Sequence, residues 1–360
     1  MINTNTFYLT KNYHFKALDG LRGIAAIGVL LFHFMEIVAP KYEDSFIPHS
    51  YLAVDFFFCL SGFVIAHAYD DKFAEIGTWT FIKRRLVRLQ PLVFIGAVIG
   101  LLAFVFDPFS DLIKRFETYQ IVLLFLSGSF LIPYPIVPER YNNLFHLNPP
   151  TWSLFWEYIA NVVYALVLVR ATKRVLWPLF IIAAGLLCWQ SYKSGFLAEG
   201  FGGDNFWAGG IRLFFSFTAG LLAYRSKWII PNKLPFWFLS IALAWVFFMP
   251  FSETISPVFD PAIVIVYFPI LLAFSAGADQ SSYGKAETTT IKWLGKISYP
   301  LYMVHYPFIW LFYSYVQRNA PNMEEMAWIV SVGMVLTTVL AHLVLRYLNE
   351  PIRKYLGRYR

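Results

Sequence analysis

Residues 18–33 read LDGLRGIAAIGVLLFH, and this stretch decides how the fold is interpreted. It opens with Asp19 and Arg22 and continues through apolar and small residues as far as His33. His33 follows Arg22 by 11 positions, three helical turns plus about 20°, so both side chains would leave nearly the same face of a helix. The pair would lie roughly 16 Å apart along the axis, about half the thickness of a bilayer. Ionisable groups at that depth are costly to hold, which makes them functional candidates.

The composition is that of a membrane protein. Of 360 residues, 58% are hydrophobic and 14% are charged, whereas soluble domains are about half apolar and a quarter charged. The net charge is +7, and in a membrane protein the basic residues usually mark cytoplasmic loops. We therefore expect no nucleic-acid partner. The seven histidines share no HExxH-like spacing, so we expect no metal site. Apolar segments occur at 18–38, 51–69, 86–106, 118–133, 152–169, 175–192, 206–224, 235–250, 260–278, 297–316 and 326–348.

Charges between these segments set the expected topology. Lys and Arg gather near 83–88, 170–174, 225–227, 285–296 and 346–360, and the positive-inside rule places such groups in the cytoplasm. That placement requires the 118–133 segment to enter and leave on one side, and its roughly 16 residues fall short of the length that a spanning helix needs. We therefore expect an all-α polytopic protein with about ten transmembrane helices, one short re-entrant or interfacial segment, and both termini cytoplasmic. Residues 1–16 and 349–360 would be tails around a membrane domain at 17–348.

Charged and small residues mark the second and third spans. Asp55 lies near the outer end of the second span, and Ser61–Gly62 lies at about mid-depth, where small residues favour close helix packing. Arg85 and Arg88 open the third span at positions i and i+3 and so share a face. They are either an ordinary positive-inside flank or an inward-facing pair, and the guanidinium groups of such a pair suit phosphate.

Two later spans carry polar stripes. Ser153, Glu157 and Asn161 fall at i, i+4 and i+8, and a carboxylate inside a membrane needs a partner or a wet cavity. Arg212, a single cation within its own span, is a candidate to neutralise such a carboxylate. Another stripe, at i, i+4 and i+7, comprises Ser298, Tyr302 and His305. The histidine in it is either a hydrogen-bonded structural group or a catalyst.

Six motifs, taken together and in this order, resemble one known family. They are Arg22 and His33 with ten residues between them, VDFFF…SGF at 54–63, RRLVR at 84–88, WSLFWE at 152–157, GKISYPLYMVH at 295–305, and Glu350–Pro351. The chain resembles acyltransferase family 3 over residues 17–356, a family of integral-membrane enzymes that O-acylate bacterial surface glycans and related acceptors. The resemblance implies a multi-pass protein of the bacterial inner membrane with ten spans.

The resemblance also implies the substrates and the site. The donor would be acetyl-CoA or another acyl-CoA on the cytoplasmic side, and the acceptor a hydroxyl of a glycan or lipid-linked glycan reached from outside. His33 would be catalytic, Glu157 matches the family's carboxylate, and Arg22, Arg85 and Arg88 would bind the donor or hold the site. Further candidates for substrate or donor binding are Asp19, Trp152, Ser153 and His305. Many members carry an appended extracytoplasmic esterase-like domain, which we do not expect here, and this leaves open whether transfer is direct or passes through another protein.

The residues themselves agree with the acyl transfer to a sugar hydroxyl that the resemblance implies. This transfer needs a base that titrates near neutral pH, and histidine is suited to this. Glu157 is the first candidate to orient His33, Glu36 the second, and Asp55 another. The alternative is a transporter or flippase in which the buried Asp, Glu, His and Arg residues relay protons or bind a solute. Transporters of that kind show corresponding broken segments in two halves, and no such repeat is evident. The residues do not determine the oligomeric state.

Overall fold

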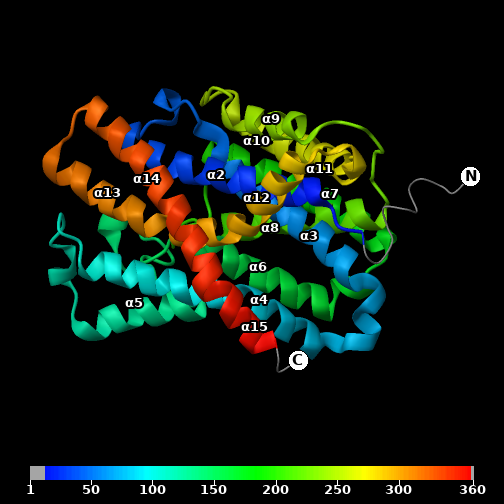
Figure 1. Cartoon of the computed structure of the whole chain (residues 1–360), viewed down its shortest axis with the longest axis horizontal. Helices are drawn as coiled ribbons and strands as arrows, with labels where there is room; N and C mark the ends of the chain where they lie inside the picture. The colour runs from blue at the N-terminus through cyan, green and yellow to red at the C-terminus, as the bar shows by residue number, and fades with distance from the viewer. Residues whose placement is uncertain (1–12, 358–360) are drawn as a thin grey trace, which may run out of the picture.

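The structure is a computed structural model that describes residues 13–357, and these form a bundle of helices joined by loops (Figure 1). Its α-helices are α2 (Lys16–Val38), α3 (Ala53–Tyr69), α4 (Phe73–Val105), α5 (Thr118–Phe130), α6 (Thr151–Leu166), α7 (Lys173–Ser194), α8 (Phe206–Arg225), α9 (Phe236–Phe247), α10 (Ser256–Ala262), α11 (Phe268–Ala276), α12 (Lys285–Val304), α13 (Tyr306–Asn319), α14 (Met323–Val344) and α15 (Glu350–Gly357). The all-helical prediction is confirmed. The tails expected at 1–16 and 349–360 lie partly outside the described residues.

Between residues 13 and 357, six helical stretches are long and apolar enough to cross a membrane. They are Lys16–Val38, Pro48–Val105, Lys173–Ser194, Phe206–Arg225, Ser256–Ala276 and Met323–Gly357. The second of them holds two helices, α3 and α4, in succession. The chain is therefore a polytopic membrane protein.

Two further apolar helices, α5 and α9, are shorter than these six stretches. The segment expected to be short at 118–133 forms α5, with 13 residues, and a capping box of Glu117 and Gln120 fixes its start. The segment at 235–250, which we counted as a span, forms an α9 of only 12 residues. At 1.5 Å per residue both fall well short of a hydrocarbon core of about 30 Å. Length therefore does not separate α5 from α9, and the ten-span topology depends on the distribution of charge.

This topology predicts that the segments on either side of α5 lie outside the cell. Single cysteines at Asp111 and Asn142 should both react with a membrane-impermeant maleimide applied to whole cells. The background would carry Cys59→Ala and Cys188→Ser, and a cysteine at Lys227 would serve as the cytoplasmic control. Labelling of one outer position but not the other would show that α5 crosses the membrane.

Helix α2 packs against α12, α9, α13 and α14, and small residues allow the closest of these approaches (Figure 1). A Cβ atom on Gly23 would lie 2.5 Å from the Cβ of Leu294 in α12. Likewise, a Cβ on Gly62 in α3 would lie 2.2 Å from the carbonyl oxygen of Phe217 in α8. The packing role considered for Gly62 is thus confirmed.

The helix that carries Arg85 and Arg88 is longer than expected. It was expected to begin near residue 86, but α4 begins at Phe73 and continues past a turn at Gly77, where φ is +71°. Glycine adopts this left-handed backbone without strain. The two arginines therefore lie inside a helix rather than at its start.

Where one span was expected at 297–316, the structure has two helices. The break falls at His305, between α12 and α13. Pro307 has no N–H, so the carbonyl of Met303 loses its partner one turn later. The side-chain amide of Asn148, from the loop before α6, donates to that carbonyl at 2.8 Å. The loop thereby stabilises the break.

Candidate active site

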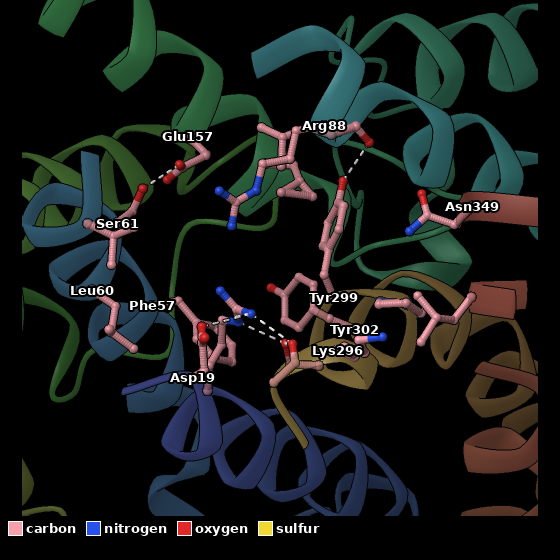
Figure 2. Close-up of a pocket in the computed structure, with 18 of the residues that line it drawn as sticks. Asp19, Phe57, Leu60, Ser61, Arg88, Glu157, Lys296, Tyr299, Tyr302 and Asn349 are labelled. Carbon is pink, nitrogen blue, oxygen red and sulfur yellow. Dashed lines mark hydrogen bonds and ion pairs between the residues drawn. The ribbon is translucent and has the colours of Figure 1, made fainter. Parts of the chain in front are cut away.

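A cavity of about 460 Å³ lies among α2, α3, α4, α6 and α12. Figure 2 shows side chains from these helices pointing into the common space. Its inner end is formed by the buried side chains of Ser153, Ser298 and Tyr302. Its rim carries the exposed side chains of Lys292 and Lys296. The cavity is therefore open at one end of the bundle and closed near its middle.

The lining of the cavity is strongly basic. Seven Lys or Arg side chains face three carboxylates: Lys16, Arg22, Arg85, Arg88, Lys292, Lys296 and Arg353 against Asp19, Glu157 and Glu350. Within residues 13–357, the side chains of Lys16, Arg88 and Lys292 form neither a hydrogen bond nor an ion pair. Unpaired cations around a cavity favour an anionic ligand, and guanidinium and ammonium groups are the usual partners of phosphate.

Glu157 is held by two neighbours across the cavity. Its Oε1 accepts from Arg85 Nη2 at 2.8 Å and from Ser61 Oγ at 2.5 Å. Asn161 donates to the backbone carbonyl of Glu157 at 2.7 Å, so the stripe expected on α6 is buried on one face. The carboxylate of Glu157 thus neutralises Arg85, and it is not the carboxylate in contact with His33.

Arg22 connects α2 to α12. Its Nε donates to Ser298 Oγ at 2.8 Å, and its Nη2 donates to the carbonyl of Gly295 at 2.7 Å. Asp19 lies 3.3 Å from the same guanidinium and also binds His14 at 2.8 Å. With its neighbours so arranged, Arg22 presents a fixed positive charge to the cavity.

His33 lies outside this cavity, on the other side of a closed layer. Its Nδ1 is 2.5 Å from Oε2 of Glu36, and Oε1 of Glu36 accepts from the hydroxyl of Tyr42 at 3.4 Å. The side chains of His33 and Glu36 are 20% and 30% exposed, so this pair is accessible. Glu36, the second candidate from the sequence, is therefore the carboxylate that contacts His33.

The layer between the cavity and His33 consists of Tyr302 and His305, and we call it the Tyr302–His305 layer. The hydroxyl of Tyr302 is 2.8 Å from Ser153 Oγ at the inner end of the cavity. The ring of His305 stacks on His33, with centroids 5.4 Å apart and planes 18° apart. His305 Nδ1 lies 3.1 and 3.0 Å from the carbonyl oxygens of Leu301 and Tyr302. The two histidines predicted on different spans thus meet.

Two other predicted site residues lie away from both places. Asp55 forms an ion pair with Arg212 at 2.6 Å, and both side chains are at most 1% exposed. Trp152 lies over Arg212, with the guanidinium carbon 5.4 Å from its ring centroid. The expectation that Arg212 neutralises a buried carboxylate is confirmed, and Asp55 does not contact His33.

Some residues that line the cavity were not predicted from the sequence to do so. Lys292, Lys296 and Arg353 were counted only as cytoplasmic charges, and Ser61 only as a packing residue. Lys292 and Lys296 stand at i and i+4, and this spacing is the signal that would have placed both on one face of a helix. For Arg353 and Ser61 we find no such signal, because their positions depend on tertiary packing.

The chain is similar to one known protein family and to several known proteins. The family profile described as "Acyltransferase domain" matches residues 15–346. O-acetyltransferase OatA of Staphylococcus aureus is 26% identical over 364 residues, which cover 95% of this chain and 57% of OatA. Peptidoglycan O-acetyltransferase OatA of Listeria monocytogenes is 25% identical over 362 residues, which cover 94% of this chain and 56% of that protein. The chain spans little more than half the length of these relatives.

A third relative and the family profile complete the comparison. "Protein 2 in picA locus" of Rhizobium radiobacter is 36% identical over 170 residues, which cover 44% of this chain and 85% of that protein. No solved structure matches the chain. The profile runs from the residue before α2 to the turn that follows α14, and it therefore includes the His33–Glu36 pair and most of the residues that line the basic cavity. The chain accordingly belongs to the acyltransferase 3 family of integral-membrane proteins.

Proposed function

We propose that the chain transfers an acetyl group from acetyl-CoA to a hydroxyl of an extracytoplasmic glycan, with His33 as general base. The observation that carries this proposal is the arrangement of two half-sites. A basic cavity lies on one side of the Tyr302–His305 layer, and an accessible His–Glu pair lies on the other. Two relatives are named as O-acetyltransferases, and one as acting on peptidoglycan, which supports acetyl as the group and a glycan as the acceptor class.

The basic cavity suits the donor. Coenzyme A carries several phosphates, and Lys16, Arg88 and Lys292 are cations without protein partners within the described residues. At about 460 Å³ the cavity lies within the range of small-molecule sites. Its inner end, at Ser153 and Tyr302, would receive the acyl end of the donor. The rim, with its exposed lysines, would then face the cytoplasm, in agreement with the positive-inside rule.

The His33–Glu36 pair suits the acceptor. A carboxylate only accepts hydrogen bonds, so Nδ1 of His33 carries the proton and Nε2 keeps its lone pair. That lone pair can remove the proton of a sugar hydroxyl as the oxygen attacks the acyl carbon. Glu36 then stabilises the imidazolium that forms, as an orienting carboxylate does in other acyl transferases and hydrolases.

A second cavity, of about 620 Å³, adjoins this pair through Tyr42. The aromatic rings of Tyr42, Phe196 and Phe251 line it and pack against one another, with centroids 5.4 to 5.7 Å apart. Glu43 and Glu253 add polar groups to its wall. Aromatic faces with a few polar groups suit a sugar ring, which has both apolar and hydroxylated surfaces.

Mass analysis of surface glycans tests this function directly. Cells with the gene should carry an alkali-labile acetyl ester that cells without the gene lack, and expression of the native chain should restore it. Expression of His33→Ala at an equal level provides the matched control. Identical glycan profiles with and without the gene would contradict the proposal.

Donor binding gives a separate prediction. Arg88→Lys keeps the charge but loses the guanidinium fork, so the affinity for acetyl-CoA should fall roughly tenfold, the equivalent of one charge-assisted hydrogen bond. Calorimetric titration of the purified variant measures this. Arg84→Lys is the control, because Arg84 lies one turn before Arg88 in α4 but does not line the cavity. Equal affinities for Arg88→Lys and the native protein would indicate that Arg88 is an ordinary positive-inside flank of the membrane span and does not bind the donor.

A further inference from the structure

We propose that His305 carries the acyl group between the two half-sites as an acyl-imidazole on its Nε2 atom. The inference rests on the proposed function and adds a covalent step to it. The donor's acyl group would pass first to His305 and then to the acceptor hydroxyl activated by His33.

The hydrogen bonds of His305 determine which nitrogen is free. Its Nδ1 lies 3.1 and 3.0 Å from two backbone carbonyls, and a carbonyl oxygen only accepts. Nδ1 therefore carries the ring proton, and Nε2 has a lone pair. This Nε2 atom is buried and has no hydrogen-bond partner within residues 13–357. Buried polar atoms are normally satisfied, so an unpaired acceptor in a side chain that is 1% exposed calls for an explanation.

The place of His305 in the fold supplies that explanation. On one side it neighbours Tyr302, with ring centroids 5.9 Å apart, and Tyr302 lines the donor cavity. On the other side it stacks on His33, which opens toward the acceptor half-site. His305 is thus the nucleophilic side chain within the layer that separates donor from acceptor. It is also set at the helix break, where its backbone carbonyl partners hold the ring in one orientation.

A relay also answers a geometric difficulty. His33 does not line the donor cavity, so the thioester and the acceptor hydroxyl are not in one continuous space. Direct transfer would require the layer to open for both substrates together. With a relay, only Tyr302 has to leave its hydrogen bond with Ser153 for the thioester to reach His305. Covalent catalysis of this kind divides one difficult transfer into two easier ones.

The acyl group is transferred in two steps. The Nε2 lone pair of His305 adds to the thioester carbonyl carbon, an N–C bond forms, and the C–S bond breaks with its electron pair on the thiolate of coenzyme A. The acceptor oxygen then attacks the acyl carbon of the cationic acyl-imidazolium, and its proton passes to Nε2 of His33. The N–C bond breaks with its electron pair returning to His305. His33 finally releases its proton to solvent on the acceptor side, and the thiolate takes up a proton from solvent on the donor side, so no oxidant or reductant is needed.

Isotope exchange tests the relay without any acceptor. The purified full chain in lipid nanodiscs is mixed with acetyl-CoA and tritiated coenzyme A, and tritium entering acetyl-CoA is measured. A relay predicts exchange by the native protein. His305→Asn should lose this exchange down to the rate without protein, because the asparagine amide can replace Nδ1 toward the carbonyls but supplies no equivalent of Nε2. His33→Ala should lose transfer to the glycan yet retain exchange, since His33 acts only in the second step.

Two controls keep the result interpretable. His146→Asn alters another buried histidine with unpartnered nitrogens outside the layer, and it should retain exchange. Calorimetric binding of coenzyme A by His305→Asn would show that the variant is folded. If His305→Asn does not fold, acetyl trapped on the native His305 peptide after rapid quenching decides the question, and its absence overturns the relay.

The outcomes separate the relay from the proposed function. A native protein that acetylates glycan in cells but shows no exchange would overturn the relay and leave the function standing. Exchange retained by a folded His305→Asn would overturn the role of His305. Loss of exchange in His33→Ala, with retention in His305→Asn, would move the covalent step to His33.

Discussion

His33→Ala is expected to abolish acetyl transfer to the glycan, by about 10²- to 10⁴-fold, the usual contribution of a general base. The protein should still insert in the membrane, because alanine is easier to bury than histidine. It should also bind acetyl-CoA normally, since His33 does not line the basic cavity. Glycan-ester analysis and calorimetric titration with coenzyme A measure the two properties separately.

A variant of the orienting carboxylate sharpens this test. Glu36→Gln keeps a hydrogen-bonding side chain 2.5 Å from His33 but cannot balance the imidazolium charge, so transfer should fall in the same range. Asp44→Asn is the matched control, because Asp44 is an exposed carboxylate on the segment that follows α2 and lines neither cavity. Near-normal transfer by His33→Ala would remove the mechanism, and loss of both transfer and donor binding would place His33 in the donor site.

Arg212→Ala is expected to lower the free energy of unfolding by about 3–5 kcal/mol, the usual result of removing one partner of a buried ion pair. Asp55, 0% exposed, would lose the guanidinium that lies 2.6 Å away. Arg212 also donates to the backbone carbonyls of Tyr51 and Glu199, so two loops would lose an attachment. The melting temperature of the protein in detergent and the recovery of monodisperse protein measure the effect.

The exposed ion pair of Arg115 with Glu139 provides a control for this prediction. Its side chains are 67% and 39% exposed, and solvent-exposed pairs contribute little. Arg115→Ala should therefore melt close to the native protein. The double variant Asp55→Asn with Arg212→Met should recover part of the loss, because it leaves no buried charge unpaired. An Arg212→Ala protein that melts with the native protein would contradict the structural role.

The helices were largely predictable because apolar runs determine them. Each of the eleven apolar segments coincides with helix, and small residues such as Gly62 indicated close approaches. The break at His305 was not predicted, although the proline two residues later carried a signal. Prolines at 91 and 178 lie inside helices that continue, so a proline by itself does not locate a break. The difference is that Asn148 stabilises the carbonyl freed at this break, and that contact joins distant parts of the chain.

The sequence predicted many of the residues at the candidate site, but it did not predict which of them contact one another. Helix periodicity predicted that Arg22 and His33 leave one face of a helix, and in the structure Arg22 lines the basic cavity whereas His33 does not. Glu157 and Glu36 were both predicted as partners of His33. The tertiary packing pairs Glu157 with Arg85 instead, which the sequence alone does not indicate. Local spacing favours Glu36, three residues from His33, since such neighbours meet on a helix surface.

The Tyr302–His305 layer has a consequence for the energised membrane itself. In the proposed topology, the basic cavity on one side and the accessible His–Glu pair on the other would bring water close to the middle of the bilayer from both faces. A few aromatic and imidazole rings are then what keeps ions and protons from crossing. If the proposed function holds, the protein would have to insulate the membrane as well as transfer the acyl group, and mutations that loosen these rings should make the membrane leak protons whether or not the cell needs the acylated product.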